Sequence, residues 1–200
     1  MIRVPRIGRS LLAVIIGLAG LGCQLRRPDV MPNRMIEPQF LEPQLTEPEQ
    51  RNATADKAAP IRLLDTQARG HIGRRLLYQQ PSGELTEDPI WRWSSPPDRY
   101  LDTAIRLELA SSPTLRLVDA AGAPALAPTL LIWNLESAGE TRLVGAVEFQ
   151  FTGPDRVVHT HLVRESEPTS AELPGNLAAV AGRLLRRIAL EGVTRVARDR

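Results

Sequence analysis

Cys23 is the only cysteine of this 200-residue chain, and its surroundings are typical of a thiol that accepts a lipid. An apolar run from Leu11 to Leu21 precedes it, and the small residue Gly22 stands directly before it. The run itself follows three basic residues, Arg3, Arg6 and Arg9. These are the parts of a bacterial signal peptide, and about 11 apolar residues are too few to span a bilayer comfortably. We therefore predict that residues 1–22 are removed and that Cys23 is acylated.

The residues around Cys23 also predict which membrane holds the anchor. Gly22 fits the usual motif, whereas Gly20 occupies a position where Leu is common. The alternative is an uncleaved anchor in the inner membrane with an unmodified Cys23, but polar, proline-rich sequence follows the cysteine at once. The next residue is Gln24 and not the Asp that retains lipoproteins in the inner membrane of enteric bacteria. We expect an outer-membrane anchor that faces the periplasm and uses more than one acyl chain.

The charge balance argues against a nucleic-acid partner. The chain has 25 Lys plus Arg against 23 Asp plus Glu, and removing the three arginines of the signal leaves 22 against 23. The mature chain is therefore close to neutral and has no excess of positive charge for a phosphate backbone. With its one cysteine acylated it has no intrachain disulfide, so a packed core must stabilise it.

Residues that could catalyse a reaction are few. The sequence has no Gly-rich phosphate loop with a lysine, no G-x-S-x-G motif and no further cysteine. His159 and His161 lie two residues apart on one face of a predicted strand, but no Asp, Glu or Cys at fitting spacing completes a metal-ligand set. We expect two surface histidines, no metal, no cofactor and no enzymatic activity.

Two groups of residues are candidates for partner contacts. Trp91 and Trp93 flank Arg92, and on a strand both indoles point to one side while Arg92 points to the other. We expect Trp93 to fill the core, and Trp91 with Arg92 to contact a partner, because exposed Trp and Arg are enriched at binding hot spots. Arg183 and Arg187 flank the apolar stripe of the last predicted helix, either as a solvated face or as a second site for a partner or a lipid headgroup.

Residues 23–60 predict a lipidated tether. The segment is rich in proline, including Glu-Pro pairs at 37–38, 42–43 and 47–48. Each proline removes a backbone donor and favours an extended predecessor. Some 37 residues at about 3.1 Å each could reach on the order of 100 Å. The alternative is that Phe40, Leu41 and Leu45 dock onto the domain or a partner.

Residues 61–200 are enough for one domain with a real core. Extended segments are predicted at 61–65, 74–79, 84–93, 114–118, 129–135, 141–151 and 157–164. One helix is predicted from a cap at Ser95 to about Ala110, with Glu108 outward, and a second from about residue 170 to Val196. The alternation of Val147, Phe149 and Phe151 predicts one buried sheet face. We expect an α+β fold in which two helices pack on one face of an antiparallel or mixed sheet of about five to six strands.

Residues 74–109, RRLLYQQPSGELTEDPIWRWSSPPDRYLDTAIRLEL, carry a resemblance to a known family. They resemble the ABC-type transport auxiliary lipoproteins, in which a strand ending in Tyr is followed by Glu-Leu and by a Trp shortly before a helix opened by Pro. Here those positions are Tyr78, Glu84-Leu85, Trp93 and Pro96-Pro97. The resemblance extends more weakly over residues 60–195. The family usually has an opening strand with Tyr-x-Leu soon after the cysteine, where this chain has its proline-rich segment.

The resemblance implies a non-enzymatic subunit of an ABC-linked lipid-transport system that helps to preserve envelope integrity. Its partner would be a membrane-anchored protein with mammalian-cell-entry (MCE) domains, and assembly into a ring would fit. The alternative is a lipid-binding module that shields an acyl chain between helix and sheet.

Overall fold

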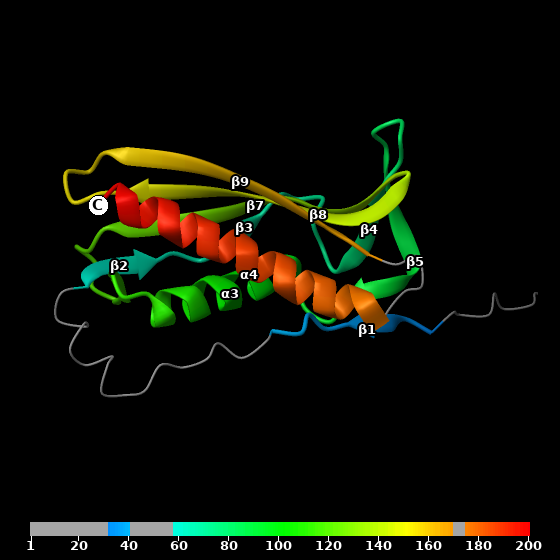
Figure 1. The fold of residues 1–200 in the computed structure, drawn as a ribbon, viewed down its shortest axis with the longest axis horizontal. Coiled ribbons are helices and arrows are strands. Elements are labelled where there is room, and N and C mark those ends of the chain that lie inside the picture. The colour runs from blue at the N-terminus through cyan, green and yellow to red at the C-terminus, as the bar shows by residue number, and fades with distance from the viewer. Residues whose placement is uncertain (1–31, 41–57, 170–174) are drawn as a thin grey trace, which may run out of the picture. The chain divides into compact units, whose positions relative to one another are not determined.

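The computed structural model describes residues 32–40, 58–169 and 175–200 (Figure 1). The expected signal peptide, Cys23 and residues 24–31 and 41–57 of the expected tether lie outside these residues. The elements in chain order are β1 (Arg34–Ile36), β2 (Ala59–Leu63), β3 (Gln67–Ala68), β4 (Arg75–Gln79), β5 (Leu85–Trp93), α3 (Pro97–Ser111), β6 (Leu115–Leu117), β7 (Ala125–Ala138), β8 (Glu140–Thr152), β9 (Val158–Pro168) and α4 (Gly175–Arg198).

Nine strands of the described residues form one mixed sheet around β7. Along one side β7 pairs with β8 over its full length, antiparallel, from Ala125↔Thr152 to Ala138↔Glu140, and β8 pairs with β9 in the same way. Along the other side β7 pairs in parallel with β2, β3 and β4 in turn. Within the described residues, the expected α+β class with two helices is confirmed. The expected five to six strands were too few, because β1 and β3 are only three and two residues long and show no alternation.

Both helices lie on one face of this sheet, where α4 crosses β8 and β9 and packs beside α3 (Figure 1). The predicted alternation in β8 is confirmed, because Val147, Phe149 and Phe151 are all buried under the helices. Trp93 is 0% exposed, as predicted, and its ring centroid lies 5.7 Å from that of Trp133. Helices and sheet therefore share one apolar core.

The start of α3 differs from the prediction. The helix begins at Pro97 after Pro96, and no side chain caps it, so Ser95 is not its cap. A proline in the first turn lacks the N–H that would otherwise need a partner. The backbone N–H of Ser95 instead donates to the hydroxyl of Tyr100 at 2.7 Å.

Glu108 of α3 is also placed differently. It was predicted to face outward, but it is buried and accepts a hydrogen bond from Arg186 Nε of α4 at 3.0 Å. A helix-period pattern marks Glu108 as polar and therefore outward, and it cannot show that a second helix covers this position with a complementary arginine.

Part of the expected tether belongs to the domain. β1 pairs in parallel with the end of β5, Arg34 beside Trp91 and Ile36 beside Trp93, and Ile36 is buried in the core. Residues 37–40 then cross α4, where the N–H of Gln39 donates to Ala178 O at 3.0 Å. A Cβ at Gly182 would lie 1.8 Å from Gln39 O, so backbone meets backbone there. We call residues 34–40 the N-terminal strap. The tether prediction does not hold for them, because Ile36 supplies an apolar side chain that the core buries.

Candidate functional site

The predicted partner site around Trp91 lies at the end of β5 that β1 covers. Trp91 and Arg92 are both half-buried. The guanidinium of Arg34 lies over the Trp91 ring, 5.3 Å from its centroid, within the range of a cation–π contact. Met35 points to the opposite face beside Arg92, and its side chain is 55% exposed. The structure thus adds Arg34 and Met35, which sequence reasoning missed because it assigned them to the tether.

Arg74, directly before β4, supports this end of the sheet. Its guanidinium donates to two backbone carbonyls, Trp93 O and Ser94 O. Next to it, Arg75 forms an ion pair with Glu87 across the β4–β5 hairpin. The ion pairs among the described residues include none formed by Arg34, Arg74 or Arg92. The β1 end of the sheet therefore carries several positive charges that the described acidic residues do not pair.

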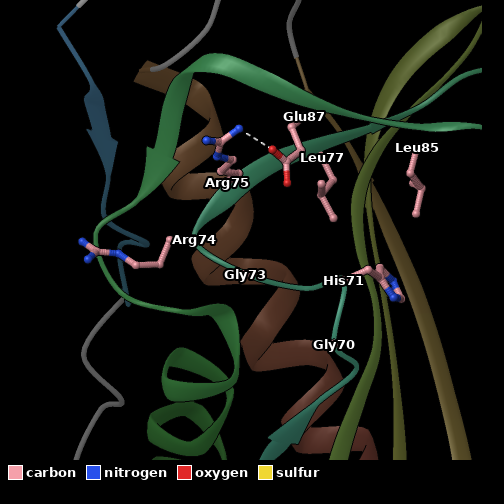
Figure 2. A pocket seen from close by; sticks show the side chains of 8 residues that line it. All are labelled: Gly70, His71, Gly73, Arg74, Arg75, Leu77, Leu85 and Glu87. Carbon is pink, nitrogen blue, oxygen red and sulfur yellow. Dashed lines mark hydrogen bonds and ion pairs between the residues drawn. The ribbon is translucent and has the colours of Figure 1, made fainter.

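A hollow of about 380 Å³ opens beside Arg75, between the β3–β4 loop and the β4–β5 hairpin (Figure 2). Its wall combines the Arg75–Glu87 pair with the apolar side chains of Leu77 and Leu85. Arg74 points away from it in Figure 2. Because Glu87 already satisfies Arg75, the hollow offers little uncompensated charge to a ligand.

Tyr78 stands on β4 near the same hairpin. Burial raises the pKa of Tyr78 to about 12, and the negative charge of Asp88 with a hydrogen bond to it adds to the shift. The phenol therefore stays protonated at neutral pH and acts as a hydrogen-bond donor and not as a base. Through its burial and its hydrogen bond to Asp88, Tyr78 therefore stabilises the β4–β5 hairpin.

Arg183 and Arg187, the second predicted partner site, lie along β9. Arg183 Nε donates to Glu167 at 2.5 Å, and Arg187 forms an ion pair with Glu165 at 3.2 Å. Each guanidinium remains about half exposed. The structure shows both arginines paired with glutamates of the same chain. It does not test a partner contact, which stays a prediction.

The same side of α4 also covers the open edge of the sheet. Among the described strands β9 pairs only with β8. Arg187 donates to Ser166 O at 2.9 Å, and Arg195 donates to Leu162 O at 3.0 Å. Backbone carbonyls at an open edge can pair with another chain, and these arginines occupy two of them.

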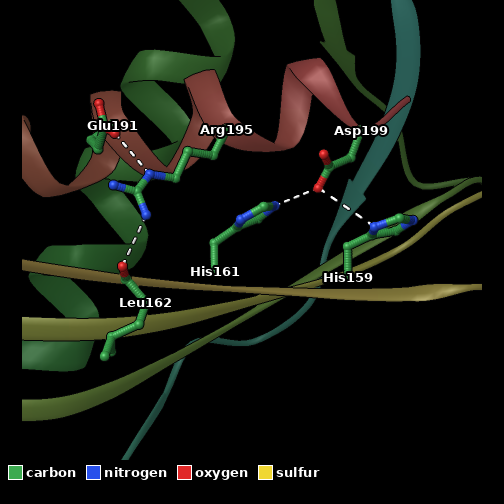
Figure 3. Close-up of polar contacts among 6 residues, drawn as sticks. All are labelled: His159, His161, Leu162, Glu191, Arg195 and Asp199. Atoms are coloured by element: carbon green, nitrogen blue, oxygen red, sulfur yellow. Dashed lines mark hydrogen bonds and ion pairs between the residues drawn. The ribbon is translucent and has the colours of Figure 1, made fainter.

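The two histidines of β9 meet an acid that sequence spacing could not reveal. Asp199, directly after α4, hydrogen-bonds His161 and lies 3.7 Å from Nδ1 of His159 (Figure 3). Within residues 32–40, 58–169 and 175–200, no group of three or more His, Cys, Asp or Glu could hold a metal ion. The cluster fastens the end of α4 to β9. The fold brings together residues 38 positions apart, which no local pattern indicates.

Two further observations concern the helices of the described residues. None of their helices is long and apolar enough to cross a membrane. Between α4 and β8, an added Cβ at Gly145 would lie 2.7 Å from Ile188, and one at Gly192 would lie 2.3 Å from Phe149. The contact of helix and sheet is therefore closely packed at both positions.

Comparison with known proteins shows the fold. No family model and no curated protein matches this chain. A protein of family DUF330 from Xanthomonas campestris has a similar structure, with a TM-score of 0.61 at 16% identity over 84% of this chain and 95% of its own. A hypothetical protein from Chlamydia trachomatis gives 0.54 at 13% identity over 70% and 96%. The described domain thus has the α+β fold that is also found in a DUF330 protein.

Proposed function

We propose that this chain is a lipid-anchored auxiliary subunit of an envelope lipid-transport system. In this proposal Cys23 carries the acyl chains, the domain faces the periplasm at the outer membrane, and its role is to hold a partner with MCE domains. The subunit itself catalyses no reaction. Assembly of several copies into a ring is compatible with the proposal.

The fold shared with the DUF330 protein is the observation that carries this proposal. It agrees with the fold that the sequence resemblance implies. The residues behind the resemblance also occupy one structural unit: Tyr78 lies on β4, Trp93 ends β5, and Pro97 begins α3. A β-hairpin that leads directly into a helix explains why these residue types recur at this spacing.

The alternative, a module that shields an acyl chain between helix and sheet, has less support. The close contacts of Gly145 and Gly192 leave no room for a chain where α4 crosses β8. The hollow of Figure 2 lies at the hairpin and has an ion pair in its wall. Native mass spectrometry that finds a bound lipid in the purified protein would favour this alternative.

Crosslinking in intact cells tests the partner. The expected result is that the chain, purified from envelope membranes after crosslinking, brings down a protein with MCE domains. As a control, the Cys23→Ala variant should bring down much less, because it is not concentrated at the membrane. Recovery of the wild-type chain alone and as a monomer would contradict the proposal.

A further inference from the structure

We infer that the β1 end of the domain rests on the phospholipid surface that holds the anchor, with Arg34, Met35, Trp91 and Arg92 as its contact residues. We call these four residues the lipid-facing surface. The inference rests on the proposed acylation of Cys23 and adds which part of the domain meets the membrane.

The covalent chain sets how far this surface can stand from the anchor. Only residues 24–33 separate Cys23 from Arg34. Eleven steps of at most about 3.6 Å limit the distance between the two residues to about 40 Å, whatever the path. Docking of the N-terminal strap therefore shortens the expected reach of on the order of 100 Å to less than half.

The strap also fixes which end of the domain the anchor holds. β1 lies near the start of α4, and the C-terminus lies at the other end of that helix (Figure 1). The 24 residues of α4 span about 36 Å at about 1.5 Å per residue. Because β1 is hydrogen-bonded to β5 and Ile36 is buried, a pull on the anchor acts on this end.

The residue types at this end suit a lipid headgroup region. Arg34 is exposed over Trp91, while Met35 and Arg92 occupy the opposite face of the same strand pair, so the edge of the sheet presents cations and apolar groups on both sides. Trp is enriched at membrane–water interfaces, and arginine binds phosphate groups in a planar, bidentate way. Basic residues near an anionic surface each add attraction.

Charge pairing separates these arginines from four of the five arginines of α4. Arg183, Arg186, Arg187 and Arg195 each form an ion pair with a glutamate of the chain. Arg34 and Arg92 form none with the described residues, and Arg34 instead stacks on an indole. Their charges are therefore available to an anionic partner, and the nearest such partner is the bilayer at the anchor.

Quenching of tryptophan fluorescence by brominated phospholipid tests this contact. Trp93 and Trp133 are 0% and 2% exposed, so Trp91 is the tryptophan that a bilayer can reach. The acylated full-length mature protein is placed in vesicles of phosphatidylethanolamine and phosphatidylglycerol with brominated chains. We expect quenching in the wild type that is lost in Trp91→Phe and falls by about half or more in the pair Arg34→Glu and Arg92→Glu.

A matched pair of substitutions controls for net charge. Arg116→Glu and Arg156→Glu change two exposed arginines of β6 and of the β8–β9 turn, near the C-terminal end of α4, and should leave quenching at the wild-type level. Equal quenching in both charge-reversed pairs, or none in acylated wild type, would overturn the inference. Crosslinking of Trp91 to a protein instead would show a protein partner at this surface and would also overturn it.

The mass of the mature chain separates this inference from the proposed function. An unacylated Cys23 would refute the anchor. In that case, adding the same vesicles to the unacylated chain still tests whether the lipid-facing surface contacts phospholipid. Quenching of Trp91 that depends on Arg34 and Arg92 would support lipid contact, and its absence would refute it.

Discussion

Gly192 shows how closely the core is packed at the scale of one residue. It lies on α4 over the ring of Phe149, and an added Cβ would come within 2.3–2.6 Å of three ring carbons. Phe149 is 0% exposed and sits on β8, between β7 and β9, so its ring has little room to move away.

Gly192→Ala is therefore expected to destabilise the domain by about 1–3 kcal/mol, the usual cost of forcing a methyl group into a filled core. The gain in helix propensity offsets up to about 1 kcal/mol of this. Urea unfolding followed by circular dichroism measures the change. In Gly122→Ala the added Cβ meets nothing within 4 Å, so its stability should be unchanged. Equal stability of the two variants would contradict the prediction and show that the Phe149 ring can move to make room for the methyl group.

Single residues also show what a sequence pattern can and cannot predict. Trp93 and Phe149 were placed correctly, because large aromatic side chains on a strand gain most from burial in the core. Glu108 was placed wrongly, because its environment is made by Arg186, 78 positions away. The contact between His161 and Asp199 was missed for the same reason.

The N-terminal strap is the element whose prediction differed most from the structure. Three residues of strand give no periodicity, and a proline on each side, Pro32 and Pro38, favours a spacer. The strap is ordered by tertiary contacts instead: Ile36 enters the core, and Tyr100 donates a hydrogen bond to Glu37 at 3.1 Å. The long strand β8 was predictable because Val147, Phe149 and Phe151 alternate with polar residues, whereas only residues 129–135 of β7 were predicted.

Gly182→Ala should detach residues 37–40 from α4, because its Cβ would overlap the carbonyl of Gln39. Hydrogen exchange with mass spectrometry is the measurement. We expect peptides covering residues 34–40 to exchange about tenfold faster or more, while β7 and β8 keep their protection. Gly122→Ala again serves as the control. Unchanged exchange in the strap would mean that its contact with Gly182 is not what holds it.

The arginines of α4 that cover β9 make a second prediction at this scale. Replacing Arg187 and Arg195 with alanine should free the carbonyls of Ser166 and Leu162, and an open edge promotes association between chains. Light scattering at increasing concentration should show more self-association than in the wild type. The control is Arg106→Ala, which removes an ion pair on α3 away from this edge. Equal behaviour of the two variants would refute an edge-covering role.

At the scale of the whole molecule, the strap changes how far the domain could stand from the membrane of the proposed anchor. A domain on a spacer reaching on the order of 100 Å could meet a partner far from the bilayer. With β1 docked, the proposed anchor at Cys23 and Arg34 are at most about 40 Å apart. A partner must therefore approach the membrane itself or bind the domain at the C-terminal end of α4. This geometry suits a subunit that holds a larger assembly against a bilayer.

The central claim is that acylation of Cys23 fixes the chain to the envelope. Labelling cells with radioactive palmitate, followed by membrane fractionation, tests it most directly. The wild type should carry label and fractionate with the outer membrane, whereas Cys23→Ala should carry none and leave the outer-membrane fraction. An unlabelled wild type, or a Cys23→Ala variant that stays in the membrane, would contradict the account.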